Sequence, residues 1–485
     1  MKLQLALTLL LGFYSIVGSA QAPTTDPTPT IKVKKHVKAK HKPSPIIWNV
    51  TTPSLSQEEK ARVTMEDNEP KPTKAKYVWT LEDVVQIADA HSPDLQRVRA
   101  NFEAARKRVL EAVSGYLPQV DVSGNFEQTT LPTPSAGSTV NIGTSLPYSG
   151  VMGSIRQTVF DFGKVLDQID ANRYFEKSAD QEKASIKLDV DLAVAKAFYN
   201  VALTNKLVEV AKTGVLQFDE VQRRMVVLVK TGTRPSFDLS QANLELAKSR
   251  LQLISARNAR DVARVALITL MGVPNDTSFA IKEHPPTKFK TDPKKLNLTN
   301  LTAEAFENRP ELKRNRYTVQ AVQQLHSRAI KGFLPTVDAE AWYGRFMENY
   351  PSSINNSWGA GLTLTWNIFN GFDTTARIGE MYAKMNAESA RLDKERDNIS
   401  AEVADSLLEF QRSDINVAVA RQSLDFAKIN SQLAQRRYDA NVATFLELLV
   451  ADTSLLSAQA ENVQARYQRE IALASLRRAV NGPLE

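Results

Sequence analysis

The stretch Leu117–Asp121 (LPQVD) recurs as Leu334–Asp338 (LPTVD), 217 residues further along the chain. The same offset relates Ser92–Leu95 (SPDL) to Arg309–Leu312 (RPEL). Short motifs that recur in the same order at a constant offset indicate an internal repeat, although each motif alone would be a weak signal. The sequence therefore predicts a tandem duplication.

Further along the chain the offset falls to 209, which relates Val159–Asp161 (VFD) to Ile368–Asn370 (IFN) and Asp238 to Glu447. Gly272 is matched with Gly482 at an offset of 210. The change lies between positions 118 and 160, so the second copy is about eight residues shorter in that segment. We interpret the chain as a first structural repeat (77–274), an inter-repeat linker (275–300) and a second structural repeat (301–485).

Each copy contains segments in which apolar and polar residues alternate, the pattern of a strand with one apolar and one polar face. The apolar positions of this pattern are Val120, Val122, Phe126, Leu362, Leu364, Trp366 and Ile368. Loops rich in Pro, Ser, Gly and Asn, at 132–147 and 348–357, separate the strands. The sequence predicts two β-hairpins, 118–160 and 335–369.

The remainder of each copy predicts helices. Prolines are absent from 148–234 and from 352–482, and the second of these segments has apolar residues at heptad spacing. The expected long helices are 163–231 and 372–439, and they turn back into shorter helices at 235–271 and 444–481. In front of the first hairpin we expect a short helix from Leu81 to Ala90 and another from Pro93 to Leu117, because a proline disfavours helix at the residue before it.

The two ends of the chain differ from the repeats. Lys2, the apolar run Leu3–Val17 and the small residues Gly18–Ala20 predict a secretory signal peptide (1–20), for which a buried N-terminal helix is the alternative. Residues 21–76 are rich in Pro, Lys, Thr and Glu and predict a disordered leader. Six lysines within 32–42 account for most of the formal charge of +7, so the basic charge belongs to the leader and no nucleic-acid partner is predicted.

Composition excludes several kinds of site. The chain has no cysteine, which excludes disulfides, thiolate metal sites and the lipidated N-terminal cysteine of a lipoprotein. No Ser/His/Asp arrangement, phosphate-binding loop or metal-ligand spacing is found, so we expect neither an enzyme nor a metal or cofactor site.

The hairpins and long helices together suggest an assembly. If the four strands enter a membrane they cannot close a barrel alone, since about eight strands are the practical minimum, and open edges in lipid would leave backbone groups unpaired. Three chains would supply twelve strands. The expected fold class is thus mainly α with membrane β: a tandem-repeat protomer of long coiled-coil helices and two β-hairpins, forming a trimeric twelve-stranded barrel with an α-helical tunnel.

These features resemble the TolC-like outer-membrane efflux protein family over roughly 77–485. The resemblance rests on the signal peptide, the repeat, the LPxVD strand entries, the VFDFG and IFNG strand exits, and Arg437-Tyr438 before the second turn. It implies a homotrimer in the outer membrane of a Gram-negative-type cell, in contact with outer-membrane lipid and with its helices in the periplasm. It also implies an exit duct for efflux or type I secretion, joined through a periplasmic adaptor to an inner-membrane transporter that sets the substrate.

In that family the tunnel closes where the helix turns converge. The resemblance implies a constriction or gate at Glu447, Asp238 and Tyr438, with a polar link between Tyr438 and Asp238. Ala443 stands where a basic partner is expected, and Arg234 of the other hairpin is the candidate to substitute for it. Glu447 also completes a capping box with Thr444, and an acid in a first helical turn such as Asp238 is favoured by the helix dipole. Both roles stay open for each acid. Val450 stands where a second pore acid can occur in the family.

Two further sets of residues are candidates for contacts with partners. The expected adaptor-contacting residues at the turns are Gly232, Thr233, Arg234, Asn441 and Val442. The expected membrane-interface aromatics, for which core packing is the alternative, are Tyr148, Trp342, Tyr343, Tyr350, Trp358 and Trp366.

Two other classes of protein fit part of the pattern. A trimeric coiled-coil surface or adhesin-type protein would explain the signal peptide and the heptads but not two hairpins at equivalent places in a duplication. A periplasmic adaptor has a helical hairpin but needs compact β modules between its halves. The paired amphipathic hairpins therefore favour the exit duct.

Overall fold

A computed structural model describes residues 77–132, 143–274, 279–282, 296–348 and 353–482. All of them belong to the compact unit Asn68–Glu485. The expected signal peptide and leader, Tyr350 and most of the linker lie outside the described residues.

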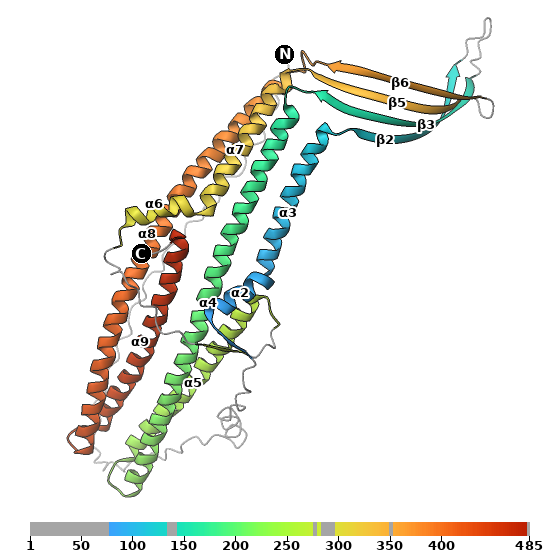
Figure 1. The fold of residues 1–485 in the computed structure, drawn as a ribbon. Helices are drawn as coiled ribbons and strands as arrows, with labels where there is room; N and C mark the ends of the chain where they lie inside the picture. Colours follow the sequence, from blue (N-terminus) through green and yellow to red (C-terminus); the bar gives the residue numbers. More distant parts are fainter. Residues whose placement is uncertain (1–76, 133–142, 275–278, 283–295, 349–352, 483–485) are drawn as a thin grey trace, which may run out of the picture. The chain divides into compact units, whose positions relative to one another are not determined.

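The structure repeats one series of helices (Figure 1). The first series is α2 (Leu81–His91), α3 (Pro93–Val113), α4 (Lys164–Lys230) and α5 (Ser236–Met271). The second is α6 (Leu298–Asn308), α7 (Pro310–Ile330), α8 (Asp373–Asp439) and α9 (Phe445–Val480). Corresponding helices have equal lengths of 11, 21, 67 and 36 residues. Within the described residues, no helix is long and apolar enough to cross a membrane.

The long helices begin and end within a residue or so of the expected positions, but one shorter helix and one strand do not. Helix α3 ends at Val113 and a 3-10 turn, η1 (Ser114–Tyr116), follows it, where the sequence had predicted helix up to Leu117. The last strand ends at Thr365, where strand had been predicted to 369. Trp366 instead donates its indole N–H to the carbonyl of Phe333 at 3.0 Å, so the chain leaves the sheet there.

The turns that bound the long helices need a left-handed residue, and glycine and non-glycine residues alternate in this role between the copies. Gly232 (φ 73°) corresponds to Asn441 (φ 58°) at an offset of 209 residues. Gly272 (φ 67°) corresponds to Asn481 (φ 51°) at the same offset. The predicted match of Gly272 with Gly482 is therefore wrong by one residue, because Asn481, which also tolerates positive φ, caps α9.

The two hairpins form one antiparallel sheet of four strands in the order β2-β3-β5-β6. The strands are β2 (Gln119–Pro132), β3 (Gly143–Phe160), β5 (Thr336–Glu348) and β6 (Ser353–Thr365). Strands β3 and β5 join the copies, with Ile155 paired to Ala341. A separate parallel pair, β1 (Tyr77–Trp79) and β4 (Phe279–Ile281), packs near α2 and α4.

The register gives the four-stranded sheet two unlike faces. We call apolar face the side whose exposed members include Val120, Val122, Phe126, Val151, Ile155, Tyr343, Trp358, Leu362 and Leu364. Arg345 and Asn356 interrupt it in one row. We call polar face the opposite side, which carries Asp121, Ser123, Asn125, Ser154, Arg156, Thr158, Asp338, Glu340 and Thr363. Apolar side chains exposed in this density on one copy indicate a surface that is covered in the working protein.

Each copy has an apolar core where its short helices meet its long ones. One core includes Val84, Phe198, Leu267 and Phe279, and the other includes Leu312, Phe410, Leu473 and Leu476. Most of these side chains have almost no exposed surface, so each pair of short helices anchors the long helices beside it.

A buried set of charges, which we call the ionic node, lies beside the second core. Arg309, 2% exposed, donates to Glu311 at 3.0 Å, to Glu402 at 2.7 Å and to the carbonyl of Ala479 at 3.0 Å. Arg478 donates to Glu402 at 2.6 Å and to Glu311 at 2.9 Å. It also reaches Asp189 of α4 at 2.9 Å, so the node joins the two copies of the repeat.

Candidate functional site

The turn between α4 and α5 and the turn between α8 and α9 pack together through buried side chains. Met225 and Ala242 of the first hairpin contact Tyr438, Phe445 and Leu448 of the second in one apolar cluster. The heptad pattern brings these residues to the helix ends, since each long helix keeps an apolar seam up to its last turn. The two turns therefore form one unit within a single copy.

Polar contacts add to this packing at the ends of the turns. Arg234 donates to the side-chain oxygen of Asn441 at 3.1 Å, and its guanidinium lies 4.7 Å from the centre of the Tyr438 ring. We call these three residues the tip clamp. Arg224 adds a second link to Asp439 at 3.7 Å.

The expected link between Tyr438 and Asp238 is not formed, and Arg234 is the basic residue that lies against Tyr438. Tyr438 does not pair with Asp238: its hydroxyl donates to the sulfur of Met225 at 3.8 Å and its side chain is buried. Burial raises the pKa of Tyr438, and the nearby Asp238 carboxylate adds to that rise, so the phenol is neutral at physiological pH. Asp238 lies in the first turn of α5, where its charge faces the helix N-terminus.

Glu447 takes the capping role that the sequence left open. Its backbone N–H donates to the Thr444 hydroxyl at 3.2 Å, and its carboxylate accepts from the Thr444 hydroxyl at 3.1 Å and from the Thr444 N–H at 3.4 Å. The carboxylate is still half exposed and lies 4.0 Å from Arg437. Capping thus leaves part of the charge directed at solvent.

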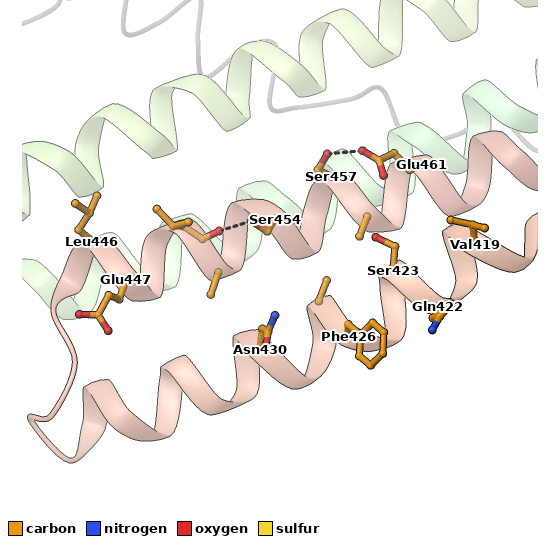
Figure 2. A pocket seen from close by; sticks show the side chains of 14 residues that line it. Val419, Gln422, Ser423, Phe426, Asn430, Leu446, Glu447, Ser454, Ser457 and Glu461 are labelled. Carbon is orange, nitrogen blue, oxygen red and sulfur yellow. Dashed lines mark hydrogen bonds between the residues drawn. The ribbon is translucent and has the colours of Figure 1, made fainter. Parts of the chain in front are cut away.

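Glu447 also stands at one end of a groove between α8 and α9 (Figure 2). The groove has a volume of about 1070 Å³, and Phe426, Asn430 and Ser454 lie along it. Val450 lines it one turn beyond Glu447. Glu461 at the far end accepts from Ser457 at 3.1 Å, so the described groove has an acid near each end.

A second, smaller cavity of about 410 Å³ lies between α4 and the α8–α9 hairpin, behind the clamp. Asp452, 5% exposed, lines it and accepts from Ser431 at 2.6 Å. Burial raises the pKa of Asp452, and hydrogen bonds from Ser431 and Gln217 offset only part of the rise. The other charged or titratable side chains of the cavity are Glu220 and Arg224 from α4 and Arg436 and Tyr438 from α8.

Asp452→Asn should make the stability of the helix ends less dependent on pH. A carboxyl whose pKa is raised in the folded state keeps its proton there while the unfolded chain loses it, so stability falls as pH rises from the usual carboxyl range through the raised pKa. The wild-type melting temperature should therefore drop more between pH 4.5 and 7.5 than that of the variant. At pH 7.5 the corresponding difference in the free energy of unfolding should be on the order of 1 kcal/mol. Circular dichroism melts would measure this.

Asp405→Asn is the control for that experiment, because Asp405 is an exposed carboxylate on α8, the helix that carries Ser431. It should leave the pH profile of wild type unchanged. Equal slopes for Asp452→Asn and wild type would contradict the assigned role of the buried carboxyl.

The remaining turn residues lie at the surface of the unit. Gly232 has a positive φ, and Val442 is exposed. The hydroxyl oxygens of Thr231 and Thr233 are 3.0 Å apart. Arg234 and Asn441 face each other in the clamp. The structure thus brings these five expected contact residues to one end of the helical hairpins.

The expected membrane-interface aromatics do not all lie on one face of the sheet. Tyr343 and Trp358 are paired neighbours on the apolar face and are exposed, and Trp366 lies exposed just past the end of β6. Trp342 corrects the expectation: it lies on the polar face, where it packs over Gly359. Tyr148 belongs to β3, but its side chain, like all of Tyr350, lies outside the described part of the structure.

Sequence reasoning missed Met225, Asp452 and the ionic node. Asp452 had a local signal in the sequence, because a carboxylate is rarely found on an apolar helix seam such as that of α9. Met225 reads only as one more apolar seam residue. In the part of the chain that the structure describes, no three His, Asp or Glu side chains are grouped so as to hold a metal ion.

Comparison with known proteins finds a family and relatives that match both repeats of the chain. The family model described as outer membrane efflux protein matches residues 84–273 and 301–482. The outer membrane protein TolC of Escherichia coli is 22% identical over 414 residues, covering 80% of this chain and 79% of TolC. The toxin and drug export protein A of Aggregatibacter actinomycetemcomitans is 20% identical over 395 residues, covering 80% and 83%.

Solved structures share the fold. The CmeC outer membrane channel of Campylobacter jejuni superposes with a TM-score of 0.73 at 17% identity, over 82% of this chain and 85% of CmeC. The outer membrane protein VceC of Vibrio cholerae gives a TM-score of 0.70 at 20% identity, over 84% and 97%.

Proposed function

Because the chain belongs to the outer membrane efflux protein family, we propose that three copies of it form one passive duct that takes its substrates from an inner-membrane pump through a periplasmic adaptor. The chain itself is an outer-membrane efflux channel, like its relatives, with helices extending into the periplasm. The family also includes a toxin and drug export protein. Efflux and protein secretion are both compatible with such a duct.

The observation that carries the proposal is the sheet with two unlike faces. Its edge strands β2 and β6 pair on one side only, and its apolar face is exposed. Open edges in lipid cost several kcal/mol for each unpaired backbone group. Three copies that join β2 of one to β6 of the next would remove those edges, cover the apolar face with lipid and line the interior with the polar face.

Exposed apolar seams on the helices support the same assembly. On α5, Phe237, Leu244 and Leu251 are exposed at intervals of seven residues, and on α8 Val419, Phe426 and Leu433 repeat this spacing. Heptad seams bury their apolar residues against another helix. We infer that α5 of one copy packs against α8 of the next.

We infer that the packed turns close the periplasmic end of the duct. The tip clamp and the cluster around Met225 support this, because they hold the two hairpins of one copy together at their ends. Gly232, Thr233, Arg234, Asn441 and Val442 would then be presented to the adaptor. Three copies would bring three Glu447 carboxylates toward the constriction.

Purified protein reconstituted in planar bilayers tests the channel. We expect stepwise ion currents from a trimer that migrates as such unheated and as a monomer after boiling. A folded trimer without conductance would overturn the duct, and a protein that is only monomeric would overturn the assembly. The coiled-coil surface protein, the other candidate from the sequence, would give a trimer without currents.

Glu447→Gln should lower the cation preference of those currents, on the order of twofold, because a ring of three carboxylates attracts cations. Gln at this position still completes a capping box with Thr444, so the helix start is preserved. Reversal potentials in asymmetric KCl would measure the change.

Thr444→Ala is the matched variant: it removes the cap and keeps the charge. It should lower thermal stability by about 1 kcal/mol and leave selectivity as in wild type. Unchanged selectivity in Glu447→Gln would leave this residue with the capping role alone.

A further inference from the structure

Trp342 breaks the alternation of the four-stranded sheet. Its neighbour Tyr343 lies on the apolar face, whereas Trp342 lies on the polar face opposite Gly359 of β6. A Cβ atom at Gly359 would come within 2.8 Å of the Trp342 indole nitrogen. The ring therefore lies across β6 against the sheet, in space that only glycine leaves open.

The polar face that carries this ring also carries charged side chains. Glu340 precedes it by two residues on the same face and pairs with Arg156 at 3.4 Å. Asp121 belongs to the same row of paired residues, through Ser154. Asp338 accepts from Thr158 at 2.8 Å. With three carboxylates and one guanidinium among these neighbours, the surface beside Trp342 is negative.

The polar face has a definite place in the assembled duct. Since the apolar face meets lipid, the polar face lines the interior of the barrel. This step rests on the proposed function. It turns Trp342 from a membrane-interface aromatic into a residue of the inner wall.

We propose that Trp342 is a cargo-contacting residue of the barrel, where its ring binds planar organic cations. The indole packs over Gly359 and stays partly exposed on this wall, and Trp has the ring that attracts cations most strongly. Carboxylates beside it add to the attraction for positive charge and repel anions. The weak, repeated contact that this provides suits a duct, because a passing molecule must bind and leave.

Block of the ion current tests the proposal. The probe is ethidium, a planar organic cation, added on the side of the bilayer that faces the open barrel, and 1-pyrenesulfonate serves as the planar anion. Ethidium should reduce the wild-type current at lower concentration than 1-pyrenesulfonate. Trp342→Ala should raise the half-blocking concentration of ethidium about fivefold to tenfold.

Two variants separate cargo contact from a purely structural role. Trp342→Leu keeps apolar bulk over Gly359 without the π-face and should weaken ethidium block nearly as much as alanine, whereas a space-filling role alone would leave block unchanged. Trp358→Ala removes the same ring from the apolar face, where it is 75% exposed, and should leave block as in wild type.

The outcomes also separate this inference from the proposed function. Wild-type currents with the same ethidium block in wild type, Trp342→Leu and Trp342→Ala would overturn the site and leave the duct intact. Equal weakening by Trp358→Ala would overturn it as well. Absence of any current in folded wild-type trimers would overturn the duct first.

Discussion

Replacing Arg309 by Met should lower the free energy of unfolding by about 3–5 kcal/mol, the cost typical of breaking a buried ion pair by removing one partner. The guanidinium is 2% exposed and binds two carboxylates and a backbone carbonyl. Its loss leaves Glu311 buried with Arg478 as its remaining cation. Chemical denaturation followed by circular dichroism would measure the change.

The partners of Arg309 make the prediction sharper. Burial disfavours the charged form of Glu402, yet Arg309 and Arg478 hold its pKa below the usual value. The node therefore contributes stability that is present at neutral pH and lost as pH falls through that lowered pKa. Glu402→Gln combined with Arg309→Met should recover part of the loss, because it removes a carboxylate that has lost a partner.

Arg391→Met is the control for surface charge. This arginine lies on α8 itself, but its side chain is 62% exposed and lies 3.8 Å from Glu388 of the same helix. Exposed pairs contribute about 0–1 kcal/mol. A loss below about 1 kcal/mol in Arg309→Met would contradict the assigned weight of the ionic node.

Arg234→Ala should open the periplasmic end of the duct and raise the open probability about tenfold. It removes a charged hydrogen bond to Asn441 and a cation–π contact with Tyr438, which together contribute roughly 1–3 kcal/mol in each copy at a partly exposed position. About 1.4 kcal/mol corresponds to a factor of ten in an equilibrium. The apolar cluster around Met225 stays, so the helices remain folded. Single-channel recordings would report the change.

Arg223→Ala is the matched control for the clamp. Arg223 lies on α4, the helix that leads into the turn, but it is 73% exposed and binds Asp219 of its own helix at 2.7 Å. It should leave the open probability unchanged. Closed-state currents in Arg234→Ala that equal those of wild type would contradict the clamp as part of the gate, while the duct itself would stand.

Much of the fold was predictable because its signals are local. Long proline-free segments, capping residues such as Thr444 and turn residues such as Gly232 indicated the ends of the two long helices to within a residue or so. The strand alternation predicted both hairpins. The prediction failed past Thr365, because Trp366 and Ile368 continue the alternation although the strand has ended. The indole N–H of Trp366 donates to the carbonyl of Phe333, which lies outside the sheet.

The site was less predictable, because its contacts join residues distant in sequence. Composition and spacing indicated that Arg234 and Tyr438 lie at two turns. Only the packed structure shows that Arg234 donates to Asn441 and that the Tyr438 hydroxyl donates to Met225. The face of Trp342 depended on strand register, which one extra residue would reverse. The ionic node was invisible because its members are separated by up to 289 positions.

The node also distinguishes the two halves of the chain. The positions that correspond to Arg309, Glu402 and Arg478 in the first copy are Ser92, Ala193 and Thr269, none of them charged. Around a trimer, joints that have the ionic node beside their apolar core would then alternate with joints that lack the node. Apolar contacts weaken on cooling, and the ionic joints weaken on acidification. Acidification should therefore loosen the joints of the second copy first, so divergence after duplication has given the ring two kinds of joint that differ in pH dependence.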